Sequence, residues 1–295
     1  MPSPSMMPRL CSMPVLSPTG GFVRLAWAEW GAEDSRRTVL CMHGLTRNGR
    51  DFDVLAAALA AAGWRVVAPD VPGRGRSEWL RRPEDYGYPF YVAAMAALIG
   101  RLGVDTLDWV GTSMGGLIGM MVAAQAATPI RRLVLNDVGP LVPKAAIEVI
   151  AGYVGHDPRF ENLAAVAAYL RHIHAPFGKL TDAQWRHLAT HSSAPADRGH
   201  LRLHYDPAIA NAFKGVEIKD AVLWPVWEAV ACPTLVLRGA ESNLLLRETA
   251  AEMTRRGAAA AGGLVELREI AEAGHAPALM APDQIELVRD FLGRS

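Results

Sequence analysis

The chain has few cysteines, no long apolar run and no excess of charge of either sign. Its 295 residues include three cysteines, Cys11, Cys41 and Cys232. Such an odd and sparse set excludes a disulfide framework and favours a reducing compartment, so we expect a cytoplasmic protein. No stretch approaches the roughly 20 apolar residues that a membrane-spanning helix needs. Lysine plus arginine and aspartate plus glutamate both number 30, so charge gives no reason to expect nucleic acid or a membrane as partner.

The first 18 residues lack the apolar run and the cleavage pattern of a signal peptide. They are rich in proline, serine and methionine, and we expect residues 1–18 to form a flexible lead-in. The whole chain is 51% hydrophobic, which supports a sizeable core. Its length suffices for one large domain with an inserted segment.

Strand-like and helix-like segments alternate along most of the chain. The strand-like runs cover residues 22–30, 38–42, 65–69, 107–110, 132–136, 234–238 and 264–270. The helix-like runs cover residues 51–62, 90–102, 114–127, 247–255 and 282–292. This alternation predicts an α/β fold with a mostly parallel sheet and helices on both faces. The alanine-rich stretch 258–263 is predicted to be a surface loop.

The alternation breaks between residues 140 and 231, where the patterns are helical only. These patterns cover residues 144–153, 163–174, 182–191 and 207–214. The predicted organisation is therefore an α/β core made of residues 19–139 and 232–295. A helical segment, residues 140–231, is inserted between the sixth and seventh strands.

Residues 111–115 read Gly-Thr-Ser-Met-Gly, which fits the pattern G-x-S-x-G directly after a strand-like run. A serine on such a strand-to-helix turn has its hydroxyl exposed to a substrate. The flanking glycines avoid clashes with the neighbouring strand and helix. The backbone N–H of Met114 would lie at a helix N-terminus, where it can stabilise an oxyanion. We therefore expect Ser113 to be a nucleophile.

Two further segments add the groups that a nucleophilic serine needs. The apolar strand 38–42 ends in His43 and Gly44, and the loop after it would supply a second oxyanion donor, the backbone N–H of Leu45. We expect the His43 side chain to shape this loop through a hydrogen bond. His275 follows the last strand-like run, from where a histidine can take the proton of the serine and return it.

Taken in order, these motifs resemble an α/β-hydrolase of the lidded serine esterase type, similar to carboxylesterases. The resemblance covers nearly the whole chain and rests on residues 43–44, 70–77, 111–115, 135–140, 237–242 and 274–277. It implies an eight-stranded type of sheet, a small-molecule ester as substrate, and no metal or organic cofactor. It also implies that residues 140–231 form a lid over Ser113. Residues 70–77 lack the third glycine of a nucleotide-binding loop and are predicted to be a turn after the fourth strand.

The inserted segment is also expected to line the substrate pocket. The pocket candidates are Leu141, Phe177, Tyr205, Trp224, Trp227 and Leu244. Two histidine pairs in this segment, at positions 187 and 191 and at positions 200 and 204, have the spacing with which one helix face can bind a metal. No cysteine or carboxylate stands nearby in the sequence to complete a site, so we expect packing or surface roles and no metal.

The acid of the site departs from the family pattern. Relatives usually carry an aspartate where this chain has Asn243, and an amide can orient an imidazole but stabilises the imidazolium poorly. Two carboxylates could replace it: Glu241, two residues away, and Asp137 at the end of the sixth strand, where some relatives place their acid. The favoured interpretation puts Asn243 in the acid position, with Asp137 as the substitute charge.

The sequence thus predicts a serine hydrolase that cleaves carboxylic esters through an acyl-enzyme on Ser113, with His275 as general base and acid. Two other functions stay open. One is the hydrolysis of carbon–carbon bonds in ring-cleavage products. The other is a binding protein of this fold that has lost turnover, which Asn243 favours. A serine at position 113 argues against dehalogenases and epoxide hydrolases, which use an aspartate there.

Overall fold

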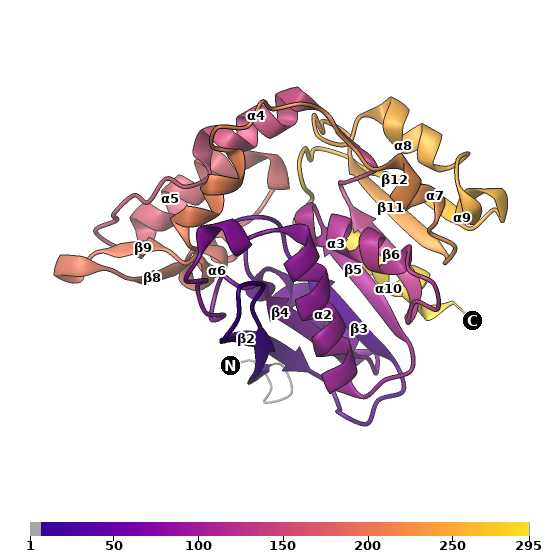
Figure 1. The fold of residues 1–295 in the computed structure, drawn as a ribbon, viewed down its shortest axis with the longest axis horizontal. Helices are drawn as coiled ribbons and strands as arrows, with labels where there is room; N and C mark the ends of the chain where they lie inside the picture. The colour runs from indigo at the N-terminus through magenta and orange to yellow at the C-terminus, as the bar shows by residue number, and fades with distance from the viewer. Residues whose placement is uncertain (1–6, 295) are drawn as a thin grey trace.

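The computed structural model describes residues 7–294, which form a central sheet with helices on both faces (Figure 1). The sheet strands are β1 (Arg9–Leu16), β2 (Phe22–Trp30), β3 (Thr38–Met42), β4 (Arg65–Asp70), β5 (Leu107–Thr112), β6 (Ile130–Asn136), β11 (Thr234–Gly239) and β12 (Val265–Ile270). In these residues the strand order is β1-β2-β4-β3-β5-β6-β11-β12. From β4 to β12 in this order, each strand is parallel to the next. Strand β2 is antiparallel to both of its neighbours, β1 and β4. The predicted α/β fold with a mostly parallel, eight-stranded sheet is confirmed.

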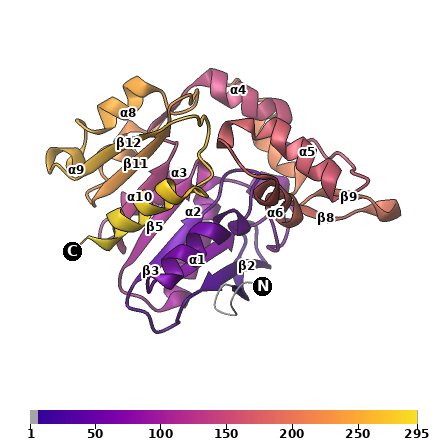
Figure 2. The ribbon, with the colours of Figure 1, turned by 180° about the vertical axis from the view of Figure 1, so that it is seen from behind.

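Helices cover both faces of the sheet, as the predicted alternation requires. The helices of the core are α1 (Asp53–Ala61), α2 (Tyr88–Leu102), α3 (Met114–Ala123), α8 (Arg247–Met253), α9 (Ala258–Ala261) and α10 (Pro282–Gly293). Helices α2 and α3 lie in front of the sheet in Figure 1, and α1 and α10 cover the opposite face in Figure 2. Strand β3 between them is buried along its whole length, which explains why it reads as a continuous apolar run. No helix within residues 7–294 is both long enough and apolar enough to cross a bilayer.

The described part of the N-terminal segment corrects the prediction of a flexible lead-in. Residues 9–16 form β1, which pairs along its length with β2 at the edge of the sheet. The strand is mostly exposed and contains Pro14, and proline is tolerated in edge strands because no ladder bond is lost there. Residues 1–6 of the predicted lead-in lie outside the described residues. The predicted loop at 258–263 is also wrong, because residues 258–261 form α9.

The segment between β6 and β11 is not purely helical, so that prediction is wrong. It contains the helices α4 (Lys144–Tyr153), α5 (Leu163–Ile173), α6 (Asp182–Ser192), α7 (Trp224–Glu228) and the 3₁₀ helix η6 (Pro207–Phe213). It also contains the short strands β7 (Leu141–Val142), β8 (Ser193–Pro195), β9 (Leu201–Leu203) and β10 (Ala221–Val222). These pair as β7 with β10 and β8 with β9. The second pair projects from the side of the molecule where α5 and α6 lie (Figure 1).

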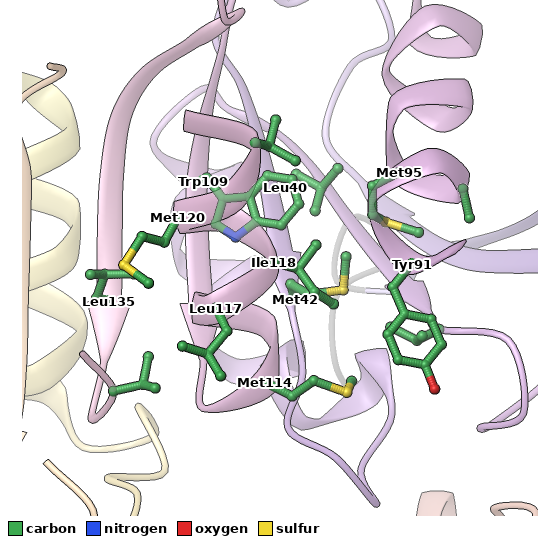
Figure 3. Packing of buried hydrophobic residues seen from close by; sticks show 14 of the residues in the cluster. Leu40, Met42, Tyr91, Met95, Trp109, Met114, Leu117, Ile118, Met120 and Leu135 are labelled. Atoms are coloured by element: carbon green, nitrogen blue, oxygen red, sulfur yellow. The ribbon is translucent and has the colours of Figure 1, made fainter. Parts of the chain in front are cut away.

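Helix α3 packs directly on β5, and this contact sets where the turn between them lies. Figure 3 shows Trp109 of β5 among Ile118 and Met120 of α3. Trp109 is fully buried, and its Nε1–H donates a hydrogen bond to the carbonyl oxygen of Gly115 at 3.0 Å. A Cβ on Gly119 would lie 2.3 Å from Nε1 of Trp109. The helix can therefore approach the strand this closely only with glycine at position 119.

We predict that Gly119→Ala lowers the free energy of unfolding by about 1–3 kcal/mol, because the added methyl group must displace the buried indole. Urea denaturation measures this change. The matched control is Gly100→Ala in α2, where a Cβ would meet no atom within 4 Å, and there the greater helix propensity of alanine stabilises by about 0.5–1 kcal/mol. Equal effects of the two substitutions would contradict the packing argument.

Candidate active site

Ser113 stands on a sharp turn between β5 and α3. Its backbone has φ 53° and ψ −119°, a conformation that non-glycine residues adopt rarely and mostly where the surrounding structure imposes it. A Cβ on Gly115 would lie 2.2 Å from the carbonyl oxygen of Met42, and one on Gly111 would lie 2.4 Å from that of Gly115. Both glycines of the motif are therefore needed for the turn to pack against β3 and α3.

A continuous series of hydrogen bonds joins Ser113 to a buried carboxylate. The Oγ atom of Ser113 lies 2.9 Å from Nε2 of His275, and Nδ1 of His275 lies 2.7 Å from Oδ2 of Asp137. Asp137 is fully buried and also accepts hydrogen bonds from the N–H of Gly239 at 2.8 Å and from the hydroxyl of Ser242 at 2.6 Å. Three donors therefore hold this carboxylate in place, and one of them is the imidazole.

The prediction that Asn243 occupies the acid position is wrong. Asn243 and Glu241 are both exposed on the loop after β11, and the carboxylate that contacts His275 belongs to Asp137. The physical reason is the strand order, which puts β6 between β5 and β11. The residue after β6 therefore lies between the serine turn and the loop that follows β11. Ser242, which lies in the motif 237–242 but was given no role from the sequence, is the residue of that loop that reaches Asp137.

The loop after β3 is held by buried polar side chains. Nε2 of His43 accepts a hydrogen bond from the N–H of Val71 at 2.9 Å, so Nδ1 carries the proton and donates to the carbonyl oxygen of Gly44 at 2.7 Å. Burial lowers the pKa of His43 to about 3, so the ring is neutral. The predicted structural role of this side chain is confirmed. Arg74, which sequence analysis treated only as part of a turn, is fully buried and donates from Nε to the carbonyl oxygen of Leu45 at 2.8 Å.

Two chambers meet at Ser113. The larger has a volume of about 320 Å³ and is lined by aliphatic side chains and three tyrosines, among them residues of α2, α3, α4 and η6. The smaller has a volume of about 130 Å³, and its lining includes the polar residues Arg47, His174, Asn243 and His275. Ser113 and Leu45 line both chambers. The residue at position 113 is thus reached from two sides of different polarity.

The pocket predictions are partly wrong. Leu244 lines both chambers and Phe177 lines the smaller one. The other four candidates lie outside both. Trp227 donates a hydrogen bond to the backbone of Arg256, whose guanidinium lies 4.4 Å from the ring centroid of Trp224. The backbone of Leu141 pairs with β10, and the hydroxyl of Tyr205 contacts the backbone of residues 155 and 156. Trp224 and Trp227 thus attach the inserted segment to the core at Arg256, whereas Leu141 and Tyr205 make contacts within the segment.

The comparisons with known proteins agree with this geometry. Residues 37–282 match the family model of the alpha/beta hydrolase fold. The chain belongs to the α/β-hydrolase family. It is 45% identical over 295 residues to the 3-hydroxybutyrate-oligomer hydrolase of Cupriavidus necator, covering 97% of this chain and 98% of that protein.

Two further relatives are more distant. A 2-(acetamidomethylene)succinate hydrolase of Mesorhizobium japonicum is 28% identical over 221 residues, which cover 74% of this chain and 75% of that protein. The crystal structure of an α/β hydrolase from Novosphingobium aromaticivorans is 35% identical with a TM-score of 0.85, covering 98% of this chain and all of that one. The predicted enzyme class, a carboxylic ester hydrolase, is confirmed by these relatives.

One histidine pair of this hydrolase does meet a carboxylate, contrary to the sequence-based expectation. Nε2 of His187 lies 3.3 Å, and Nε2 of His191 4.0 Å, from Oδ2 of Asp53 at the start of α1. These are the donor types that bind zinc, and the three ligand atoms lie within 4.8 Å of one another. The same carboxylate already pairs with Arg50 at 2.5 Å. We interpret the cluster as an ion-pair bracket that holds α6 against the loop after β3.

A hydrogen bond from Asn48 to the backbone of α6 reinforces the bracket. Nδ2 of Asn48 donates to the carbonyl oxygen of His191 at 3.0 Å. The hydrogen bond with Asp53 raises the pKa of His187 above its usual value, whereas burial lowers that of His191 to about 4. His187 is therefore the histidine of the pair that binds a proton more readily in the folded protein, where it contacts Asp53.

We predict that His187→Gln destabilises the protein more at pH 6 than at pH 9. A raised pKa in the folded state gives stability that is fully present below the unfolded pKa of about 6.5 and is lost as the pH rises through the folded value. Urea denaturation of both proteins at the two pH values measures the difference. His172→Gln, at an exposed position of α5, is the control. A cost for His187→Gln that does not change with pH would contradict the assignment.

Proposed function

We propose that this hydrolase cleaves carboxylic esters through an acyl-enzyme on Ser113, and that its natural substrates are oligomers of a 3-hydroxy acid. The observation that carries the mechanism is the hydrogen-bond series from Ser113 through His275 to Asp137. A hydroxyl, an imidazole and a carboxylate in this order are the parts of a serine nucleophile, its base and the group that orients the base. The substrate class follows the relative that is 45% identical.

The first half of the reaction transfers the acyl group to the enzyme. Oγ of Ser113 attacks the ester carbonyl carbon while Nε2 of His275 takes the hydroxyl proton. The backbone N–H groups of Leu45 and Met114 stabilise the oxyanion, since the first N–H groups of α3 have no partner within the helix. The bond from the carbonyl carbon to the alcohol oxygen then breaks, and His275 returns the proton to that oxygen.

The second half releases the acid. Water replaces the alcohol, His275 takes one of its protons, and the attack on the acyl carbon breaks the bond to Oγ of Ser113. The proton then returns to Oγ. Asp137 supports both halves, because its Oδ2 accepts the Nδ1–H and so stabilises the imidazolium that forms twice per cycle. All groups of this scheme belong to the chain, so it includes no step on a cofactor or metal.

The inserted segment, residues 140–231, is proposed to act as a lid that selects substrates. Side chains of α4 and η6 line the larger chamber, and α4 and α5 contribute to the smaller one. Such contacts lie away from the reacting carbonyl and supply binding rather than chemistry.

The alternative of a binding protein without turnover rested on Asn243 as the residue in the acid position. The hydrogen bond of His275 to Asp137 removes that reason.

We predict that Ser113→Ala lowers kcat/KM by about 10³-fold or more, both for a 3-hydroxybutyrate trimer and for p-nitrophenyl acetate. Folding should be nearly unchanged, because the hydroxyl faces the chambers. Ser12→Ala, at an exposed position of β1, is the control and should keep full activity. A fluorophosphonate probe should label wild type at Ser113 only, since it reacts with activated serines.

Two results would refute the proposed function. Turnover of these esters by Ser113→Ala at a rate near that of wild type would exclude this residue as the nucleophile. Wild type that cleaves neither the trimer nor the nitrophenyl ester, but does cleave a carbon–carbon bond in a ring-cleavage product, would assign the other reaction class.

A further inference from the structure

We infer that the smaller chamber is a carboxylate-binding subsite for the leaving group, in which Arg47 recognises the free acid end of the oligomer. The enzyme would then cut the ester bond nearest the carboxyl terminus and release one hydroxy acid at a time. This inference rests on the proposed function and adds to it a direction of cleavage.

The position of His275 assigns the two chambers to the two sides of the ester. The leaving oxygen receives its proton from Nε2 of His275, so the alcohol portion must lie on the side where this ring is exposed. His275 lines the smaller chamber but is not among the residues that line the larger one. The larger chamber, which no charged residue within 7–294 lines, suits the acyl portion. In an oligomer this portion is the longer, uncharged part of the substrate.

Among the described residues, Arg47 is the permanently charged one in the lining of the smaller chamber, and this lining includes no aspartate or glutamate. The residue is only 5% exposed and stands two positions after Leu45, in the loop that would hold the oxyanion. Nε and Nη2 of Arg47 donate to Asp51, each at 2.7 Å. A guanidinium carries five N–H groups, so three remain for a ligand. Asp51 is outside the lining of both chambers.

Asp51 pairs with Arg47 from outside the chamber, and the other polar groups of the chamber wall add no negative charge beside the guanidinium. Burial, followed by the charge of Arg47, holds the pKa of His174 well below its usual value, so this ring is neutral. Asn243 contributes an uncharged amide to the wall. A carboxylate at that position would face the bound anion. Asp137 bonds to Nδ1 of His275 and lines neither chamber. The carboxylate that orients His275 therefore puts no negative charge in the chamber that receives the substrate carboxylate.

The chemistry of a 3-hydroxy acid fits this arrangement. In its oligomers, two carbons separate the ester oxygen of the last unit from the free carboxylate. The leaving group is therefore short and anionic, and it matches the chamber that has the smaller volume and the guanidinium of Arg47 in its wall. Arginine pairs with carboxylates through parallel N–H···O bonds, which are stronger than bonds between neutral groups.

The test compares a 3-hydroxybutyrate trimer that has a free carboxylate with its methyl ester. We expect kcat/KM of wild type to be at least about 10-fold higher for the free acid, in line with a buried charge-assisted hydrogen bond. In Arg47→Gln this ratio should fall close to 1. Arg50→Gln is the matched control, because Arg50 lies in the 3₁₀ helix Gly49–Phe52 that follows the loop of Arg47, pairs with Asp53 and is outside the lining of both chambers. It should keep the ratio of wild type.

A second variant keeps the test valid if Arg47→Gln does not fold. Asn243→Asp changes an exposed loop position, and its carboxylate should lower kcat/KM for the free acid at least about 5-fold more than for the methyl ester. The direction of cleavage is read from a trimer labelled with carbon-13 in its carboxyl-terminal unit. The first monomer released by wild type should carry the label.

The outcomes separate this inference from the proposed function. Equal kcat/KM for acid and methyl ester in wild type, or first release of an unlabelled monomer, would overturn the subsite while leaving the esterase mechanism intact. An unchanged ratio in both Arg47→Gln and Asn243→Asp would overturn the role of Arg47. No hydrolysis of any ester by wild type would overturn the proposed function and the inference with it.

Discussion

The hydrogen bond between Nδ1 of His275 and Oδ2 of Asp137, 2.7 Å long, is the interaction on which the rest of the site depends. It joins a loop after β12 to the residue that follows β6, so it forms only once β6, β11 and β12 lie side by side in the sheet. Gly239 and Ser242, which bond to the same carboxylate, belong to the end of β11 and its loop. The acid is therefore fixed by the assembled sheet rather than by a local turn.

Both residues that bond to the imidazole of His275 have unusual backbone conformations. Ser113 and Asp137 both have positive φ, 53° and 55°, at equivalent places after the neighbouring strands β5 and β6. Such residues persist only where packing holds them. Here the N–H of Ser113 bonds to the carbonyl oxygen of Asn136, and the N–H of Asp137 bonds to that of Leu237. The backbone hydrogen bonds between neighbouring strands thus continue to Ser113 and Asp137, one residue beyond the strand ends.

The features that depend on local patterns could be predicted from the sequence. The serine turn, the histidine after the last strand and most strand and helix positions follow from short motifs and periodicity. The acid could not be assigned in this way, because Asp137 reaches His275 only through the order of strands in space. The same holds for Arg47 and for the contact of Asp53 with α6. Trp224 and Trp227 were predicted to line the pocket, but they pack against Arg256 of the core. Strand β1 was missed because an exposed edge strand with proline has little apolar pattern.

The most direct test of the account is the rate of Asp137→Asn. We expect kcat for p-nitrophenyl acetate to fall by about 10³-fold or more, since an amide cannot stabilise the imidazolium as a carboxylate does. Adding Asn243→Asp to this variant should not restore the rate, because residue 243 is exposed and lines the smaller chamber, whereas Nδ1 of His275 bonds to residue 137. A rate near that of wild type for Asp137→Asn, or rescue by the second change, would contradict the assignment of Asp137 as the acid.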